Sequence, residues 1–400
     1  MKILLLTQVL PYPPDSGPKV KTWNLIQYLA RQHEVTLVSF VRGNQSREVG
    51  QLRRLCAGVF TLPMERGVLR DGLALFRSLA TGVPWVIVRD ARGPMFRLVR
   101  ELSARQSFDA VHADQLNMAQ YALVARVGKK VLDTHNALWL LYRRMASTMP
   151  EGLLKWVYER DWRLLRRYEG EICRAFDAVL AVSEEDRRAL EEVSGEGRNF
   201  RVVPISVNTD EVQPVCRVAE ADRIVTLGTM FWQPNVDGIL WFVHSVLPLI
   251  RREKPDAALD IIGARPPKEV VALGEQDRLI RVTGYVEDPL PFLEQAGVMV
   301  VPLRAGGGMR VKILNALAQG LPVVTTSIGC EGIAVEHGQH VLIADTPAEF
   351  ARAVVQVLRD RSLASELGRR GRRLIETLYD YRVACRPLDD LYPPDGKRLV

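Results

Sequence analysis

Hydrophobic residues along the chain gather in short continuous runs more often than they alternate with polar residues. Nine such runs are KILLLT, EVTLVSF, AVHA, KVLDTH, AVLAVS, IVTLGT, LDIIG, VMVVPL and PVVTTS. Continuous apolar runs of this length are typical of strands covered on both faces, as in parallel sheets. Amphipathic segments with helical spacing lie between them, for example 20–31 and 236–251. This repeated strand–helix order predicts an α/β fold with right-handed βαβ units in doubly wound parallel sheets.

The alternation pauses over 202–222, where prolines and turn-forming residues interrupt any sustained period. A chain of 400 residues is also long for a single hydrophobic core. We therefore expect a first domain over 1–203 and a second domain that begins at 204, with a cleft between them. Ligands of open α/β sheets bind beyond the carboxyl ends of the strands, so the loops after the strands are the expected binding sites.

The composition, with 47% hydrophobic and 25% charged residues, is that of a soluble globular protein. No run of about eighteen apolar residues is present, so no transmembrane helix is expected. The apolar start of the chain is too short for a signal peptide and fits a first buried strand better. Five scattered cysteines without CxxC spacing indicate reduced thiols in a cytoplasm, and they disfavour a disulfide framework or a zinc site.

The net charge of +7 comes from the first half of the chain. Residues 1–204 hold about 31 Lys and Arg against about 22 Asp and Glu, whereas the remainder holds about 23 against about 25. A basic half indicates an anionic partner, which can be a membrane surface, a phosphate ligand or nucleic acid. No nucleic-acid motif or interleaved aromatic pattern is present, so nucleic acid is disfavoured as a partner.

Two stretches, 139–176 and 94–106, carry much of this basic excess, and both mix arginines with leucine and aromatic residues. A basic amphipathic helix of this kind can lie on an anionic membrane surface. It can equally pack its apolar side into a core and leave its basic side in solvent. Helical periodicity alone does not separate the two interpretations.

The stretch AGGGMRVKILNALAQG, residues 305–320, combines bare backbone with positive charge. Three glycines, Gly306 to Gly308, precede Arg310 and Lys312 at the start of an apolar-periodic helix. Glycines let phosphates approach backbone amides, and a helix N-terminus adds unpaired N–H groups and a partial positive charge. The two cations add charge-assisted hydrogen bonds. These features predict a diphosphate site, although a tight strand–helix connection uses glycines too; the absence of GxxxxGK[ST] disfavours simple NTP hydrolysis.

Two further glycine positions are expected near ligands. Gly228 and Thr229 end the strand IVTLGT, at the edge where ligands bind. The absence of GxGxxG there and near the start disfavours a nicotinamide dehydrogenase. Gly17 opens a helix with Lys19 and Lys21 in its first turn, which suits either an anion or a capped surface loop.

Polar residues that follow strands complete the candidates. His135 follows the strand in KVLDTH, and Asp114 ends the preceding strand, so the two can lie close together. Histidine exchanges protons near neutral pH, although a lone histidine is often structural. Glu331, in the loop of TTSIGCEGI, can accept hydrogen bonds from sugar hydroxyls or simply form surface contacts. Val286 can present backbone groups to a planar base, and Asp288 is expected to cap a short helix.

Taken together, these stretches resemble the GT-B glycosyltransferases of the family-4, group-1 type. The resemblance covers nearly the whole chain, and its motifs are PYPPDSGPKVKTWN, VVPISVNTD, VTGYVEDPLPFLEQAGVMVVPL, GGGMRVKILNALAQGLPVVTTSIGCEGI and YDYRV. It implies two facing Rossmann-like domains, of which the first binds the acceptor and the second, over 204–376, binds the nucleotide-sugar diphosphate. It also implies that 377–400 forms a helix and tail that cross back to the first domain. Such enzymes are usually metal-independent and retain the configuration at the anomeric carbon.

The resemblance also implies roles for single residues. His135 is similar to the family's histidine near the donor sugar, and Gly17 to the glycine of its first loop. Val286 matches a position whose backbone meets the base. Asn315 and Gly307 fall where the family's E-x7-E motif has its two glutamates, so both carboxylates are missing here.

The arginine–lysine pair that is common after the second domain's first strand is missing too, because the chain has MFWQPN there. We expect Arg310 and Lys312 to replace that pair, as in a similar GGGxRxK variant associated with exopolysaccharide biosynthesis. The expected catalytic residues are therefore His135, Arg310 and Lys312. The expected donor-binding residues are Gly17, Gly228, Thr229, Val286, Gly307, Gly308, Asn315, Glu331, Gly332 and Ile333.

The expected activity is transfer of a sugar from a nucleotide-diphosphate sugar to a hydroxyl acceptor, with no metal and no cofactor besides that co-substrate. The acceptor is expected to be a glycan or a lipid-linked glycan of cell-surface polysaccharide or glycolipid biosynthesis. The enzyme is then expected in the cytoplasm, with peripheral contact to an anionic inner membrane face. Two alternatives stay open, a catalytically silent nucleotide-sugar-binding partner protein and a GT-B-like nucleotide-sugar epimerase.

Overall fold

The computed structural model describes residues 1–195, 197, 199–218 and 220–393 of the chain. The chain forms two compact units, of which the first comprises Met1–Ser206 together with the described residues from Ala384 onward. The second unit comprises Val207–Val383. The final part of the expected tail, residues 394–400, lies outside the described residues.

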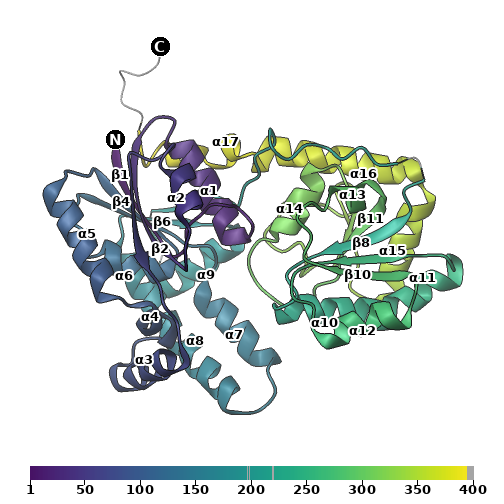
Figure 1. The fold of residues 1–400 in the computed structure, drawn as a ribbon, viewed down its shortest axis with the longest axis horizontal. Coiled ribbons are helices and arrows are strands. Elements are labelled where there is room, and N and C mark those ends of the chain that lie inside the picture. Colours follow the sequence, from purple (N-terminus) through teal and green to yellow (C-terminus); the bar gives the residue numbers. More distant parts are fainter. Residues whose placement is uncertain (196, 198, 219, 394–400) are drawn as a thin grey trace. The chain divides into compact units, whose positions relative to one another are not determined.

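The first unit is built on a seven-stranded parallel sheet in the order β3-β2-β1-β4-β5-β6-β7, with helices on both faces (Figure 1). Its strands are β1 (Lys2–Thr7), β2 (Glu34–Val41), β3 (Gly58–Pro63), β4 (Ala110–Asp114), β5 (Lys129–Asp133), β6 (Ala178–Ala181) and β7 (Phe200–Val202). Its helices are α1 (Gly17–Leu29), α2 (Ser46–Leu52), α3 (Val68–Thr81), α4 (Trp85–Asp90), α5 (Gly93–Arg105), α6 (Leu116–Ala122), α7 (Leu138–Thr148), α8 (Leu153–Ala175), α9 (Glu184–Ser194) and the short 3₁₀ turn Arg386–Leu388.

Strand β1 shows why its residues form a central strand. Successive side chains point to opposite faces of a sheet, and Leu4 and Leu6 pack in one hydrophobic core while Ile3 and Leu5 pack in the other. All four are fully buried. The core that holds Ile3 also contains Tyr392 near the end of the described chain, so the C-terminal segment returns to the first unit.

The second unit has a six-stranded parallel sheet in the order β10-β9-β8-β11-β12-β13 (Figure 1). Its strands are β8 (Arg223–Leu227), β9 (Leu259–Ile262), β10 (Ile280–Gly284), β11 (Ala296–Val301), β12 (Val323–Thr325) and β13 (Leu342–Ile343). Its helices are α10 (Gln233–Trp241), α11 (Leu247–Glu253), α12 (Lys268–Gln276), α13 (Leu290–Glu294), α14 (Val311–Ala318), α15 (Pro347–Arg359) and α16 (Arg361–Leu374), with π-helical turns at Phe242–Val246 and Ile375–Tyr379; α17 (Tyr381–Ala384) leads back to the first unit.

The two doubly wound parallel sheets confirm the predicted fold class. Each of the nine apolar runs contains a strand, whereas β3, β7, β10 and β13 are not among them. All four missed strands lie at the edges of their sheets. An edge strand is less completely covered than a central one, so its sequence does not need a continuous apolar run.

The strand order reverses at one point in each sheet, between β1 and β4 in the first unit and between β8 and β11 in the second. In open α/β sheets the loops that leave the strands on either side of such a switch point diverge and leave room for a ligand. The residues after β1 and β4, and those after β8 and β11, are therefore the places where function is expected.

Candidate functional site

The glycine-rich loop of the second unit leads from β11 into α14. Helix α14 begins at Val311, with Arg310 as its N-cap residue. Gly306 has a φ of 129° and Gly308 a φ of 74°, values that side-chain-bearing residues rarely adopt. A Cβ atom on Gly306 would lie 2.8 Å from the Arg310 guanidinium and 3.0 Å from the Trp232 ring. The glycines are thus needed for both the conformation and the close packing of this loop.

Arg310 packs against the loop that precedes it. Its side chain is buried, and its Nη1 group donates hydrogen bonds to the carbonyl oxygens of Gly307 and Gly308, the second at 2.6 Å. Its guanidinium carbon lies 5.6 Å from the centre of the Trp232 ring. In this structure Arg310 fixes the shape of the glycine loop, and its contact with a diphosphate stays a prediction.

Lys312 is the second residue of the same helix and has a different environment. Its Nζ atom donates a hydrogen bond to the side-chain oxygen of Asn235, at 2.8 Å, and no carboxylate of the described residues pairs with it. Burial and the neighbouring Arg310 guanidinium lower the pKa of Lys312 to about 7. A cation that lacks a carboxylate partner in the protein is well suited to an anionic ligand.

Gly228 follows β8 at the switch point of the second sheet and lies close to Lys312. A Cβ atom on Gly228 would lie 2.8 Å from the Asn235 amide and 3.1 Å from Lys312 Nζ. A Cβ atom on Gly263, after β9, would in turn lie 1.8 Å from the Gly228 carbonyl oxygen. The neighbouring Thr229 is exposed, and its carbonyl oxygen accepts a hydrogen bond from Asn235 at 2.8 Å. The structure therefore brings Gly228, Thr229 and Lys312 together through Asn235, which the sequence did not single out.

The other expected donor-binding residues of this unit follow strands of the same sheet. Asn315 lies on α14 and is partly buried, and Val286 follows β10 and is partly exposed. Glu331, Gly332 and Ile333 lie in the loop after β12, where Gly332 has a φ of 79° and Ile333 is buried. All of these segments leave the sheet at its carboxyl edge, and their contacts with a donor stay predictions.

In the first unit, His135 and Asp114 lie side by side as predicted. The His135 Nε2 atom is 2.9 Å from a carboxylate oxygen of Asp114, which also accepts a hydrogen bond from the Thr22 hydroxyl at 3.0 Å. The other ring nitrogen of His135, Nδ1, is buried and has no hydrogen-bond partner among the described residues. Asp114 orients the ring, which leaves Nδ1 available for a ligand.

The lysines near Gly17 are engaged by carboxylates of the protein. Lys19 pairs with Asp15 at 2.9 Å, and Lys21, which is buried, pairs with the buried Asp133. Burial alone would raise the pKa of Asp133, but Lys21 and His112 hold it well below its ordinary value. Neither lysine is free for an anion in this structure, so a ligand role for Gly17 depends on its backbone alone.

Asp133 also belongs to a group with metal-ligand chemistry. Ligand atoms of Asp114, Asp133 and His135 lie within 4.8 Å of one another. The Lys21 ammonium already supplies positive charge to Asp133. The expected independence from metal ions stays a prediction.

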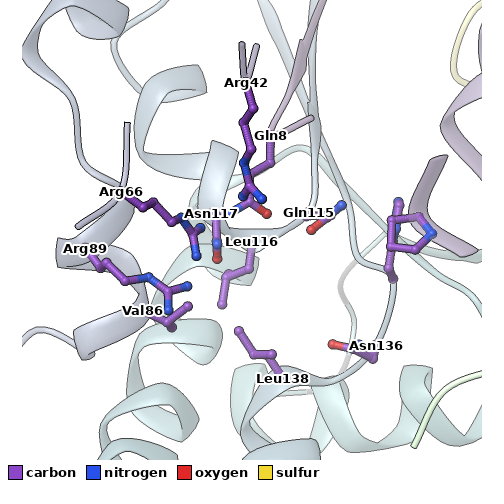
Figure 2. A pocket seen from close by; sticks show the side chains of 12 residues that line it. Gln8, Arg42, Arg66, Val86, Arg89, Gln115, Leu116, Asn117, Asn136 and Leu138 are labelled. Carbon is purple, nitrogen blue, oxygen red and sulfur yellow. The ribbon is translucent and has the colours of Figure 1, made fainter. Parts of the chain in front are cut away.

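A cavity of about 310 Å³ opens at the switch point of the first sheet, beside His135 (Figure 2). Three arginines extend into it: Arg42 follows β2, Arg66 follows β3 and Arg89 lies on α4. Gln8 and Asn117, which follow β1 and β4, contribute amide groups. These five residues were missed in the sequence, where their only signal was the basic excess of the first half.

The two basic stretches are largely packed into the first unit. In the stretch 139–176, Trp139 and Leu165 are buried in its core, and α5 buries Met95 and Val99. Apolar exposure is concentrated on α3, which lies outside both stretches, and at the start of α8, which lies within 139–176. The large apolar side chains exposed there are Val68, Leu69, Leu73, Phe76, Leu79, Leu153, Leu154 and Trp156. No helix in the described part of the chain combines the length and apolar character that crossing a membrane requires.

Comparisons with known proteins match two separate parts of the chain. The family model described as Glycosyltransferase Family 4 matches residues 16–211, and the one described as Glycosyl transferases group 1 matches residues 221–360. The chain belongs to the group 1 glycosyltransferases. The resemblance to this family is thereby confirmed, and so is the expectation that the chain is a transferase, whereas the similarity to a GGGxRxK variant stays a prediction.

This glycosyltransferase has relatives along its full length. It is 21% identical over 399 residues to an uncharacterized 44.6 kDa protein in the cps region of Klebsiella pneumoniae, with 95% of this chain and 96% of that protein covered. Its fold matches sucrose-phosphate synthase from Thermosynechococcus elongatus with a TM-score of 0.72 at 17% identity, covering 98% of each chain. It also matches Anabaena HepE, solved with UDP-glucose, with a TM-score of 0.66 at 13% identity, covering 98% and 99% of the chains. The fold is therefore the GT-B fold.

Proposed function

We propose that this glycosyltransferase moves a sugar from a nucleoside-diphosphate sugar to a hydroxyl acceptor, with the donor diphosphate bound in the second unit beside Lys312. The observation that carries the proposal is the position of Lys312 at the switch point of the second sheet, where it contacts a neutral amide and no carboxylate of the described residues. In this proposal, backbone amides of the glycine loop and of the start of α14 meet the phosphate oxygens.

The chemistry of transfer explains why a cation is needed there. The bond between the anomeric carbon and the diphosphate oxygen breaks, the acceptor oxygen forms the new bond, and the acceptor hydroxyl loses its proton. Negative charge grows on the departing diphosphate, and fixed positive groups lower the energy of that transition state. Lys312 and the free N–H groups at the start of α14 would supply this stabilisation. Arg310 would add charge from the same turn while it holds the glycine loop in shape.

His135 is the proposed contribution of the first unit to the reaction. Its unpartnered Nδ1 atom can exchange a hydrogen bond with a substrate hydroxyl, because Asp114 already holds the other ring nitrogen. We expect transfer with retention of the anomeric configuration, as the family resemblance implies. We also expect it to proceed without a metal ion, because side chains and amides of the protein would meet the diphosphate.

The biological setting that we propose is polysaccharide biosynthesis at a membrane surface in the cytoplasm. The Klebsiella relative in the cps region and the fold match to HepE with UDP-glucose support a nucleotide sugar and a glycan product. The exposed apolar side chains of α3, which include Leu69 and Phe76, are interspersed with Arg70 and Arg77. An apolar helix face that carries arginines suits peripheral contact with an anionic bilayer.

A thermal-shift screen with UDP-, GDP- and ADP-linked sugars tests the proposed function first. A donor that binds the folded state raises the melting temperature as its concentration rises, so we expect one nucleotide class to stabilise the protein and then to support sugar transfer. Stabilisation without turnover on any acceptor would favour a silent binding protein. A changed sugar in the absence of acceptor would favour an epimerase, and no stabilisation by any donor would contradict the proposal.

A further inference from the structure

The cavity of the first unit has an unbalanced charge. Three of its lining residues are arginines, and none of the described residues that line it is acidic. A carboxylate next to it belongs to Asp90, which is buried and bonded to Arg66 at 2.9 Å and to Arg89 at 3.3 Å. Asp90 is thus bonded to two of the three lining arginines and not to Arg42.

The carboxylate oxygens of Asp90 are occupied by other partners and form no ion pair with Arg42, the third arginine. Its carboxylate also accepts hydrogen bonds from the side-chain amides of Gln8, at 2.5 Å, and Asn117, at 2.6 Å. The Arg42 guanidinium has no hydrogen-bond or ion-pair partner among the described residues, and Figure 2 shows it extending toward Gln8 and Asn117. Arg42 thus enters the cavity as an unneutralised charge.

The three guanidinium groups are close enough to influence one another. Burial lowers the pKa of Arg66, Asp90 opposes this effect, the positive charges of Arg89 and Arg42 lower the pKa further, and Asp71 raises it. Arg89 is also held over the Trp85 ring at 5.1 Å, so its position is set before any ligand arrives. Like charges held together in this way repel one another until an anion binds between them.

We propose that this cavity binds a phosphate group carried by the acceptor substrate, an inference that rests on the proposed function. The positive charge of the three lining arginines suits a phosphate monoester, which carries up to two negative charges. A phosphate also offers several oxygens to arginine forks that come from different directions, whereas a carboxylate offers only two. Gln8 and Asn117 border the same space and can reach a sugar attached to the phosphate.

The phosphate can belong to a soluble sugar phosphate or to a lipid-linked sugar. Arg66 is separated by one residue from α3, whose first residues Val68 and Leu69 are 90% and 85% exposed. A helix with this apolar surface next to a phosphate-binding cavity favours an acceptor whose phosphate is attached to a lipid. The two sources share the same headgroup chemistry and differ only in the tail.

Titration with inorganic phosphate in the presence of saturating UDP tests the proposal, because UDP occupies the donor site of the second unit. We expect saturable phosphate binding that weakens about tenfold or more in Arg42→Gln, the loss expected for one charge-assisted contact. Arg42 is exposed and unpartnered, so its replacement leaves folding intact. The matched control Arg100→Gln, on the exposed face of α5, should bind phosphate like the wild type.

Competition experiments then separate the two sources. Displacement of phosphate by vesicles that contain prenyl phosphate, but not by glucose 1-phosphate, would support a lipid-linked acceptor. Displacement by glucose 1-phosphate would support recognition of the phosphate group itself. Phosphate binding that is absent, or equal in wild type and Arg42→Gln, would overturn the inference. A wild-type protein that binds phosphate but not UDP would contradict the proposed function and not the inference. Failure of the inference and failure of the proposed function are therefore distinguishable.

Discussion

The second sheet repeats the order of six strands of the first, but the lysines near the two switch points have opposite surroundings. In the first unit, Lys21 is neutralised by Asp133, and His112 lies 3.4 Å from the same carboxylate. In the second unit, Lys312 has only the amide of Asn235 as a partner among the described residues. A lysine that is paired within the protein stabilises the fold, whereas a lysine without a counter-charge costs stability unless a ligand supplies one.

This difference shows that topology alone does not define a binding site. Both lysines lie near a switch point, and both stand in helices that follow a strand. What differs is the protein carboxylate next to the lysine. Lys21 has one and forms an ion pair, whereas Lys312 has none among the described residues and can pair with an anionic ligand. Substitution of Lys21 in the first unit should therefore affect stability, whereas substitution of Lys312 in the second unit should affect donor binding.

The largest expected effect is on the stability of the first unit. Lys21→Met leaves the buried Asp133 without its ammonium partner, which should lower the free energy of unfolding by about 3–5 kcal/mol. Chemical denaturation monitored by circular dichroism measures this change. The control Lys19→Met removes only an exposed pair with Asp15 and should change stability by less than about 0.5 kcal/mol. Adding Asp133→Asn to Lys21→Met should recover part of the loss; equal stability of both single variants would be incompatible with the account.

The next largest effect is on catalysis in the second unit. Lys312→Met removes the unpaired cation and should lower kcat by about a hundredfold or more, as expected when one group that stabilises transition-state charge is lost. Its folding should stay intact, because no carboxylate of the described residues is left unpaired. Steady-state transfer assays measure the effect, with the exposed Lys268→Met as control. A Lys312→Met enzyme as fast as the control would remove Lys312 from the mechanism.

The pH dependence of donor binding sharpens the same comparison. The pKa of Lys312 in the free protein is about 7, and a bound diphosphate favours its protonated form. Above pH 7 the free lysine loses its proton, so the affinity for UDP should fall by about tenfold per pH unit until the pKa in the complex is reached. Calorimetric titrations at pH 6.5, 7.5 and 8.5 measure this slope. A slope that persists in Lys312→Met would assign it to another group.

The smallest expected effect comes from Gly228. An added Cβ atom would press against the Asn235 amide and Lys312 Nζ, so Gly228→Ala should displace both and weaken UDP binding by about five- to tenfold. Gly50→Ala is a suitable control, because a Cβ atom there meets no neighbour within 4 Å. Unchanged UDP affinity in Gly228→Ala would show that this edge of the sheet does not meet the diphosphate.

The sequence predicted best those strands that helices cover on both faces of the sheet. Central strands such as β1 and β11 need apolar residues on both faces, and this requirement is visible as a continuous run. Edge strands such as β3 are only partly covered, so no such run marks them. Local patterns also located the glycine loop and the start of α14, because helix initiation and positive φ angles depend on neighbouring residues.

The partners of the charged residues were the part that local patterns could not supply. The helix start with Lys21 suited either an anion or a capped surface loop, but the counter-charge of Lys21, Asp133, comes from a strand more than a hundred residues away. The cavity arginines, Arg42, Arg66 and Arg89, come from three separate segments that only the sheet order brings together. Charge pairing over long sequence distances is a property of the folded topology and leaves no local signal.

Calorimetric titration of UDP into Lys312→Met and Arg42→Gln tests the central claim most directly, that the donor diphosphate binds in the second unit and not in the arginine-lined cavity of the first. We predict that the dissociation constant of UDP rises about tenfold or more in Lys312→Met and stays at the wild-type value in Arg42→Gln. The opposite result, with UDP binding lost in Arg42→Gln and unchanged in Lys312→Met, would contradict the account.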